Sequence, residues 1–426
     1  MNRPQFRAIE GTRDYFGPEG DRFDKALSLA AELFRNYGYA RVRTPVFEGT
    51  DLFARSIGAA TDIVEKEMYT FSPGSDSLTL RPEGTAGAVR AYLQHGMDKQ
   101  NGLVKLWYEG PMFRRERPQK GRQRQFHQIG VEAIGSPDPL LDAEIVSLGL
   151  RYYERVGIAG VGLRLNSIGC RKEECRPRYR RLLQEAIRPN LGRFCKNCQA
   201  RFERNVLRTL DCKIPQCREL AQSLPKSHEN LCPECAEHFA AAGEALLALG
   251  APFVLDPTLV RGLDYYARTV FEFTHPALGA QNAIGGGGRY DGLVEELGGE
   301  ATPAIGFALG VERILIAMEA AGTCACSIPL QVFGATRGKA AHRAMAGLAA
   351  RLRAAGLSAD LDYQGRSLKA QLRLANRRNA MCCLILGDDE LERGEITVKD
   401  MAEGGGQATV SLFDCLEKIR EILPCG

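Results

Sequence analysis

A dense run of basic side chains lies between two apolar stretches of this 426-residue chain. Residues 110–132 read GPMFRRERPQKGRQRQFHQIGVE, and six of the eleven positions from Arg114 to Arg124 are arginine or lysine. Guanidinium groups donate hydrogen bonds in a planar fork that matches phosphate oxygens, and the interspersed glutamine amides can read base edges. A solvated hairpin tip is the ordinary explanation of such a run. The spacing favours a loop that holds a triphosphate at its root and a nucleic acid at its tip.

Two other segments carry polar side chains suited to a small charged ligand. In LTLRPEGTAG, Glu83 and Thr85 follow a predicted strand, where a carboxylate can accept hydrogen bonds from an ammonium group. In LVRGLDYYARTVFEF, Arg261 and the pair Tyr265 and Tyr266 precede a predicted strand. Each residue alone is compatible with an ordinary salt bridge or a polar core group, so only their joint presence indicates a site.

Four consecutive glycines, Gly285 to Gly288, lead into Arg289 in the segment AIGGGGRYDG. Within a strand, such a run marks the close approach of a ligand to the backbone. The alternative is a flexible loop. The run is not a dinucleotide-binding fingerprint, because the strand-to-helix turn does not follow at the required spacing.

Regular elements must position these segments, and the apolar spacing predicts where they lie. Helices are expected where apolar residues recur every three or four positions, over 21–38, 139–156, 310–321, 338–355 and 366–378. Strands are expected over 39–48, 68–71, 77–80, both sides of the basic loop within 103–135, 163–169, 253–274 and 283–290. Up to residue 322 the strands come as hairpins, which is typical of an α+β fold with an antiparallel sheet. Beyond it, strands and helices alternate, which predicts a separate α/β domain with a largely parallel sheet.

The bulk composition is that of an ordinary globular protein. Hydrophobic residues make up 44% of the chain and charged residues 25%, with a net charge of +4. A net charge this small means that any nucleic-acid surface must be local. Apolar runs stay well short of the ~18 residues of a membrane span, and the first residues lack the apolar core of a secretory signal. We therefore expect a cytoplasmic protein without a membrane segment.

The chain contains fourteen cysteines, and eight of them fall between residues 170 and 235. Two Cys-x2-Cys pairs stand 33 residues apart in this block, a pattern that fits a tetrahedral four-thiolate zinc site. The expected ligands are Cys195, Cys198, Cys232 and Cys235. The other four cysteines of the block could form another site, and buried free thiols are the alternative to zinc.

Five segments, in this order along the chain, resemble the histidyl-tRNA synthetase family, a class II aminoacyl-tRNA synthetase family of bacterial type. They are RPEGTAG, GPMFRRERPQKGRQRQFHQIGVE, RGLDYYARTVFEF, GGGRYDGLVEELGG and GFALGVERI. The resemblance covers nearly the whole chain and implies a class II antiparallel-sheet catalytic domain, a mostly helical insertion and a C-terminal α/β anticodon-binding domain. The expected boundaries are 1–169 and 251–324 for the two parts of the catalytic domain, 170–250 for the cysteine-rich insertion, and 325–426 for the anticodon-binding domain.

The resemblance also implies how ATP is held. Arg114 matches the arginine that binds the α-phosphate, and Arg122 matches a loop arginine at the γ-phosphate. Phe126 and Arg313 match the pair that sandwiches adenine by stacking and cation–π attraction. Arg261 matches the arginine between the histidine carboxylate and the α-phosphate, and we expect it to be the most important single catalytic residue. Mg²⁺ is expected to accompany ATP.

For the amino acid, the resemblance implies a pocket with two parts. The ammonium group is expected to be bound by Glu83, Thr85 and Gln128. Glu132 and Tyr266 are expected to hydrogen-bond the two imidazole nitrogens, with Tyr265 beside them. A buried polar site of this kind rejects isosteres that lack the ring nitrogens by roughly 10⁴-fold or more.

The implied partners are L-histidine, ATP, tRNA(His) and a second copy of the chain in a homodimer. Phosphate contacts are expected from the basic loop and from one face of the predicted helix at 366–378. The expected tRNA-binding residues are Gln119, Lys120, Arg124, Arg366, Lys369, Arg373 and Arg377.

Two other functions compete with ligation of histidine to tRNA through a histidyl-adenylate. A non-catalytic regulatory subunit of ATP phosphoribosyltransferase has a related fold, but it should lack the C-terminal domain and the arginines around ATP. A zinc-containing nucleic-acid-binding module without activity would leave Glu83, Glu132 and Tyr266 unexplained.

Overall fold

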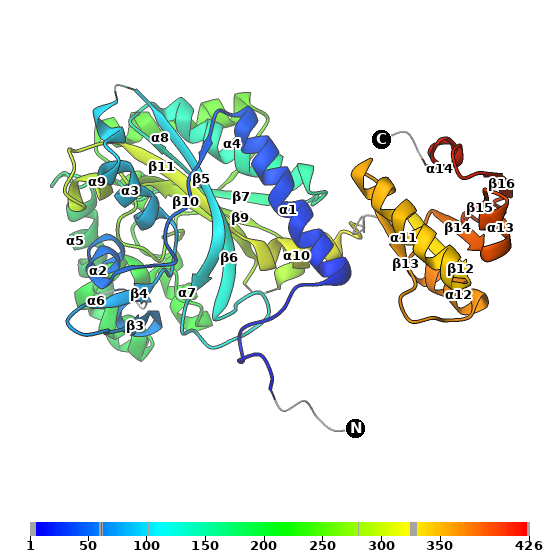
Figure 1. Cartoon of the computed structure of the whole chain (residues 1–426). Helices are drawn as coiled ribbons and strands as arrows, with labels where there is room; N and C mark the ends of the chain where they lie inside the picture. Colours follow the sequence, from blue (N-terminus) through cyan, green and yellow to red (C-terminus); the bar gives the residue numbers. More distant parts are fainter. Residues whose placement is uncertain are drawn as a thin grey trace. The chain divides into compact units, whose positions relative to one another are not determined.

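The computed structural model describes residues 6–58, 61, 63–100, 102–279, 281–323 and 330–423. The chain divides into two compact units, residues 1–325 and 326–426 (Figure 1). Within the described ranges, helices are all too short or too polar to cross a bilayer.

An eight-stranded sheet forms the centre of the first unit, with the order β1-β5-β6-β11-β10-β9-β7-β8. Its strands are β1 (Ala40–Arg41), β5 (Val104–Phe113), β6 (Gln125–Ile134), β7 (Gly162–Ser167), β8 (Val254–Leu255), β9 (Ala267–Thr274), β10 (Ala283–Arg289) and β11 (Ala304–Gly310). The six strands from β5 to β7 pair antiparallel, and only the short edge strands β1 and β8 pair parallel. The predicted α+β class with an antiparallel sheet is confirmed.

One face of this sheet carries the main core and the other face carries the polar residues of interest. In β6, Ile129, Val131 and Ala133 pack into the core, so the pleat turns Gln128 and Glu132 to the opposite face. The core face is covered by α1 (Gly17–Asn36), α4 (Pro139–Arg155), α8 (Pro233–Ala248) and α10 (Val311–Ala320). The alternation of apolar and polar residues along this strand therefore places the packing side chains and the polar side chains on opposite faces of the sheet.

Helix α1 begins four residues earlier than predicted. Pro18 occupies the first turn, where its missing N–H costs nothing, and Gly38 (φ +80°) follows the last turn. The strand predicted over 39–48 is in fact two strands in different sheets. β1 joins the large sheet, whereas β2 (Phe47–Gly49) joins β3 (Tyr69–Phe71) and β4 (Leu78–Leu80) in a small one. Pro45 lies at the break, since proline cannot donate to a ladder.

The remaining elements of the first unit form three groups. Helices α2 (Thr50–Ile57), η1 (Ile63–Glu67), α3 (Thr85–Gln94), η2 (Met97–Lys99) and α9 (Leu293–Glu296) group with the small sheet, whereas η6 (Pro276–Leu278) packs against α10 and the main core. The cysteine-rich insertion between β7 and β8 is helical: α5 (Arg176–Ile187), η3 (Arg188–Arg193), α6 (Lys196–Arg204), η4 (Val206–Thr209), α7 (Pro215–Gln222), η5 (Ser227–Glu229) and α8.

The second unit is a five-stranded sheet covered on both faces. Its order is β13-β12-β14-β15-β16, with the first three strands parallel and the last two antiparallel. The strands are β12 (Val332–Arg337), β13 (Ala359–Leu361), β14 (Cys382–Gly387), β15 (Glu395–Asp400) and β16 (Gln407–Ser411). The helices are α11 (Lys339–Ala354), α12 (Leu368–Arg377), α13 (Asp388–Glu392) and α14 (Cys415–Ile422). α11 and α14 pack on one face and α12 on the other.

Arg289, at the end of the glycine run, is a structural residue. Its guanidinium is fully buried and lies 2.7 Å from Asp142 of α4. It also donates to the carbonyls of Ser136 and Asp138, and His238 of α8 is 2.9 Å from the other oxygen of Asp142. This network ties β10 to two helices on the core face.

We predict that Arg289→Met lowers the free energy of unfolding by about 3–5 kcal/mol, because it leaves the buried carboxylate of Asp142 without its cation. Urea denaturation followed by the fluorescence of Trp107, the single tryptophan of the chain, measures this. The control is Arg151→Met, whose side chain is 57% exposed and pairs with Glu154 one helical turn away, with an expected change below about 0.5 kcal/mol. Equal midpoints for the two variants would contradict the assignment.

Candidate functional site

Arginines from three distant segments line one cleft on the polar face of the large sheet. Arg114 follows β5, Arg261 lies in the loop before β9, and Arg313 lies in α10, and all three border a cavity of about 590 Å³. Arg122 and Phe126, from the basic hairpin, line it as well. The structure thus brings the predicted ATP-binding set together.

Each of these guanidinium groups is held by a neighbouring acceptor. Arg114 Nε donates to the Pro82 carbonyl at 2.9 Å, and Arg313 Nε donates to the Gly121 carbonyl at 3.0 Å. Arg122 forms an ion pair with Glu116 at 3.0 Å. The cleft is therefore lined by cations whose orientations are set before a ligand arrives, which is the requirement for electrostatic preorganisation.

Phe126 and Arg313 both border the cleft, as expected for an adenine sandwich. The cation over the Phe126 ring in this structure is Arg114, whose guanidinium carbon lies 5.2 Å from the ring centroid. Arg313 instead donates to backbone carbonyls, including that of Ala283 in β10. Stacking of a base between Phe126 and Arg313 stays a prediction.

The glycine run is a strand, and it makes room for Arg261. A Cβ atom on Gly286 would lie 2.8 Å from Arg261 Nη1, so a side chain there would displace the guanidinium. Arg261 Nη1 pairs with Glu272 of β9 at 3.1 Å. Its Nε is buried, as is Oε1 of Gln128, and neither atom has a hydrogen-bond partner among the residues that the structure describes. Both residues line the cleft, and each has an atom with unused hydrogen-bonding capacity.

Glu132 lies at the centre of a buried hydroxyl network. Its Oε1 accepts from Thr85 Oγ1 at 2.8 Å and from Tyr108 at 3.2 Å, and its Oε2 accepts from Tyr290. Burial raises the pKa of Glu132 from 4.5 to about 8, and the hydroxyl bonds only partly offset it. A cationic or donor group entering here would find an acceptor that water does not reach.

Glu83 caps a helix in this structure. Its two oxygens accept from the backbone N–H groups of Thr85 and Ala86, the first residues of α3, at 2.7 and 2.8 Å. Burial raises the pKa of Glu83, although these bonds oppose the shift. Each carboxylate oxygen has a second lone pair, so capping and binding of an ammonium group are compatible.

The tyrosine pair is buried beside this network. The rings of Tyr265 and Tyr266 lie 4.7 Å apart, and Tyr265 also contacts the ring of Tyr290 at 5.8 Å. The sequence alone did not single out Tyr108 and Tyr290, because aromatic residues in predicted strands usually belong to the core. The signal that could have pointed to Tyr108 is a pair of glycines. A Cβ atom on Gly84 or Gly130 would lie within 2.3 Å of the Tyr108 ring, so the ring needs both positions to lack a side chain.

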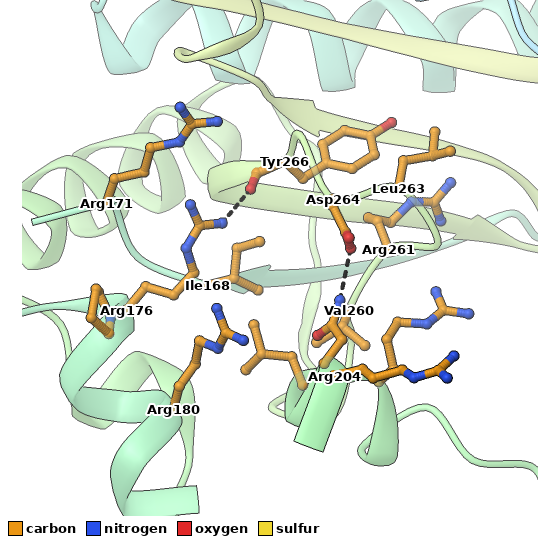
Figure 2. Close-up of a pocket in the computed structure, with 14 residues that line it drawn as sticks. Ile168, Arg171, Arg176, Arg180, Arg204, Val260, Arg261, Leu263, Asp264 and Tyr266 are labelled. Atoms are coloured by element: carbon orange, nitrogen blue, oxygen red, sulfur yellow. Dashed lines mark hydrogen bonds between the residues drawn. The ribbon is translucent and has the colours of Figure 1, made fainter. Parts of the chain in front are cut away.

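A second cavity of about 290 Å³ adjoins the cleft, and Val260, Arg208 and Arg261 line both. Figure 2 shows Arg176, from the insertion, reaching the backbone carbonyl of Tyr266, with Arg171 and Arg180 nearby. Arg171 pairs with Glu296 of α9. The arginines around this pocket are Arg171, Arg176, Arg180, Arg204, Arg208 and Arg261, against one carboxylate, Asp264. Such a surface favours a polyanion.

Comparison with known proteins decides the family. The family model described as Histidyl-tRNA synthetase matches residues 11–314, and the Anticodon binding domain model matches residues 331–422. The chain belongs to the histidyl-tRNA synthetase family. A histidine–tRNA ligase of Desulforamulus reducens is 50% identical over 94% of this chain and 96% of its own length, and one of Moorella thermoacetica is 49% identical over 98% of both. A crystal structure of apo S. aureus histidyl-tRNA synthetase is 36% identical, with a TM-score of 0.82 over 98% of this chain and 100% of that one.

The predicted zinc ligand set of this synthetase is wrong. Cys195 and Cys198 do not share a cluster with Cys232 and Cys235. Two four-cysteine clusters are present instead: Cys170, Cys175, Cys232 and Cys235 form cluster A, and Cys195, Cys198, Cys212 and Cys217 form cluster B. Each cluster combines one Cys-x2-Cys pair with one Cys-x4-Cys pair. In cluster A the two pairs are far apart in the sequence, and they meet because the end of the insertion folds back to its starting point after β7.

The tip of the basic hairpin carries the loop residues predicted to contact tRNA. Gln119 and Lys120 are exposed, and Gln119 bridges to Arg122 across the turn. Arg124 is half-buried and donates to the carbonyl of Glu10. The tip is thus available on one side and attached to the N-terminal segment on the other.

In the anticodon-binding unit, helix α12 presents the predicted basic face. Lys369, Arg373 and Arg377 are exposed, whereas Leu368, Leu372 and Ala375 pack into the core. Arg366 precedes the helix and is held by Asp362 at 2.6 Å, so it does not extend the helical stripe. Arg366 and Lys369 line a cavity of about 880 Å³ whose rim includes Tyr363, which is 68% exposed and can stack on a base.

We predict that Glu132 makes the stability of the synthetase fall as pH rises. Between pH 4.5 and its pKa of about 8, the folded chain holds a proton that the unfolded chain has released, so raising the pH favours unfolding by up to about 1.4 kcal/mol per unit. Glu132→Gln removes this term. Urea denaturation from pH 6 to 8.5 should show the variant gaining roughly 2 kcal/mol on the wild type. If the free energy of unfolding changes with pH equally in the wild type and in the variant, the pKa of Glu132 is not raised.

Proposed function

We propose that this chain ligates L-histidine to tRNA(His) in two ATP-dependent steps, through a histidyl-adenylate. The convergence of Arg114, Arg261 and Arg313 on one cleft, with Glu132 on the same face of the sheet, supports this assignment. Family membership and the full-length similarity to histidine–tRNA ligases support it independently.

In the first step, a histidine carboxylate oxygen attacks the α-phosphorus of ATP. A new phosphorus–oxygen bond forms, and the bond to the bridging oxygen of pyrophosphate breaks. The protein brings two anions together and neutralises the charge that develops between them. We assign Arg114 to the α-phosphate, Arg261 to the space between the carboxylate and that phosphate, and Arg122 to the γ-phosphate.

Selection of histidine rests on the buried polar pocket. We assign Glu132 and Tyr266 to the imidazole nitrogens, with Tyr265 packed beside them. Glu83, Thr85 and the unpartnered Oε1 of Gln128 are assigned to the ammonium group. An amino acid without ring nitrogens would not make the hydrogen bonds that an imidazole makes with Glu132 and Tyr266, and a site built for such bonds discriminates strongly against analogues that lack them.

In the second step, the 3′-hydroxyl of the terminal adenosine attacks the histidyl carbonyl, an ester forms and AMP leaves. We assign Gln119, Lys120 and Arg124 of the hairpin to the acceptor end, and the basic face of α12 with Arg366 to the anticodon region. The arginine-lined pocket beside the cleft offers nucleic-acid phosphates a further cationic surface.

Mg²⁺, a homodimer and a cytoplasmic location are part of this proposal. Two of the cleft carboxylates, Glu116 and Glu272, are already paired with arginines, and we assign Mg²⁺ mainly to the phosphates of ATP, whose charge it would screen. Zn²⁺ in the cysteine clusters is a separate proposal with its own test.

The regulatory-subunit alternative is not favoured. A structure titled ATP phosphoribosyltransferase regulatory subunit/histidyl-tRNA synthetase from Bacillus halodurans is 21% identical, with a TM-score of 0.64, which speaks for the fold alone. The present chain has both the arginines around the cleft and a second unit matching the Anticodon binding domain model.

We predict that only histidine, among the twenty amino acids, supports ATP–pyrophosphate exchange. Arg261→Ala should reduce exchange by about 10³-fold, since it removes a charge used in the transition state, while histidine binding measured by calorimetry persists. Arg151→Ala, an exposed arginine of the same unit, is the matched control. Exchange driven equally by another amino acid would refute the pocket assignment.

A second prediction separates the two units. Arg373→Ala on α12 should weaken tRNA binding and lower the slope of log affinity against log salt by about 1, as expected for one lost phosphate contact. Exchange without tRNA should be unchanged. The control Arg420→Ala alters an exposed arginine on α14, and an equal loss in both variants would argue against the α12 face.

A further inference from the structure

We propose that the insertion binds two structural Zn²⁺ ions, one in cluster A (Cys170, Cys175, Cys232, Cys235) and one in cluster B (Cys195, Cys198, Cys212, Cys217). Within each cluster, all four sulfur atoms lie within 4.8 Å of one another. In each cluster three of the four cysteines are buried and the fourth is partly exposed. Four thiolates in a closed shell are the usual ligand set of a structural zinc site.

The sulfur separations fit a single tetrahedral ion. With zinc–sulfur bonds of ~2.3 Å, the edge of a ZnS₄ tetrahedron is about 3.8 Å. Cys170 and Cys232 in cluster A, and Cys195 and Cys212 in cluster B, have Sγ atoms 3.8 Å apart. Disulfide bonds of ~2.05 Å would bring sulfurs together in pairs. An iron–sulfur cluster would hold some of the thiolates farther apart, because its four thiolates are divided between two or four irons.

Backbone groups around the sulfurs are arranged for thiolates. Cys175 Sγ accepts from the N–H groups of Cys170 and Cys232, both at 3.4 Å. Cys217 Sγ accepts from the N–H of Cys195 at 3.2 Å. Such bonds orient metal-bound sulfur and stabilise its negative charge.

Cluster A joins the insertion to the catalytic sheet. Cys170 and Cys175 follow β7, whereas Cys232 and Cys235 bracket the start of α8, so one ion connects the entry and the last helix of the insertion. Glu234, between the latter two cysteines, pairs with Lys172 and with Arg268 of β9. The ion and these two ion pairs would therefore both hold the start of α8 against the segment that follows β7.

Cluster B holds the wall of the cleft that faces the ATP-binding arginines. Cys195 and Cys212 line this cavity together with Arg208, and the cluster joins the start of α6 to the start of α7 and the segment before it. Arg171 and Arg176 of the neighbouring pocket directly follow ligands of cluster A in the sequence. Both ions therefore set where the insertion places its arginines.

The test is metal analysis of tag-free protein purified without chelator. We expect two zinc ions per chain, released as thiols react with an organomercurial, and four sulfurs at ~2.3 Å in X-ray absorption at the zinc edge. Cys235→Ser and Cys198→Ser should each lower the content from two to one. Cys415→Ser, a fully buried thiol in the other unit, should keep two. If a variant does not fold, the zinc release and the X-ray absorption of the wild-type protein still test the proposal.

Three results would overturn the proposal: metal content below about 0.2 per chain, stoichiometric iron in place of zinc, or zinc retained in full by both cluster variants. In addition, removal of zinc should expose the insertion to trypsin. These readouts do not depend on ligase activity, so a failed histidine assay and a failed metal assay are distinguishable.

Discussion

Repulsion between like charges is the constraint on which the site depends. A cleft that receives a triphosphate needs several guanidinium groups close together, and they must be held in place before the phosphates arrive. In this fold each group has its own acceptor: a carbonyl for Arg114, several carbonyls for Arg313, and carboxylates for Arg122 and Arg261. Some of these acceptors belong to the large antiparallel sheet and its hairpin, such as the Gly121 carbonyl for Arg313 and Glu272 of β9 for Arg261.

The same sheet also provides the space that the side chains of the amino-acid pocket need. Glu132 and the rings around it need space on a surface where side chains normally stand about 5 Å apart. Glycines create this space: Gly84 and Gly130 admit Tyr108, Gly306 admits the carboxylate of Glu132, and Gly286 admits Arg261. Glycines in neighbouring strands thus leave the space that the polar network fills. Glycine weakens a strand, and here this loss accompanies the room needed for the buried polar side chains.

The insertion depends on a different source of order. Apart from α5 and α8, its helices have at most nine residues and three of its elements are 3₁₀ helices, so these parts gain little stability from helix propensity. Apolar residues of the insertion, among them Tyr179, Leu183 and Phe202, form a buried core, and the buried cysteines of cluster A form a packing group of their own with Leu231. Metal cross-links at the two clusters would join segments that are far apart in the chain and would add to this core.

The sequence by itself predicted the fold class, most of the helices and strands, and a set of basic residues that share one cleft. Helical and strand periodicities and the motif segments are local properties, and the residues predicted around ATP, from Arg114 to Arg313, do line one cleft. Tertiary structure alone decided which cysteines share a cluster, that Glu83 caps α3, that Arg289 is part of the core, and that Tyr108 and Tyr290 bind Glu132. These are contacts between segments far apart in the chain, and no spacing in one segment specifies which partner another segment brings to it.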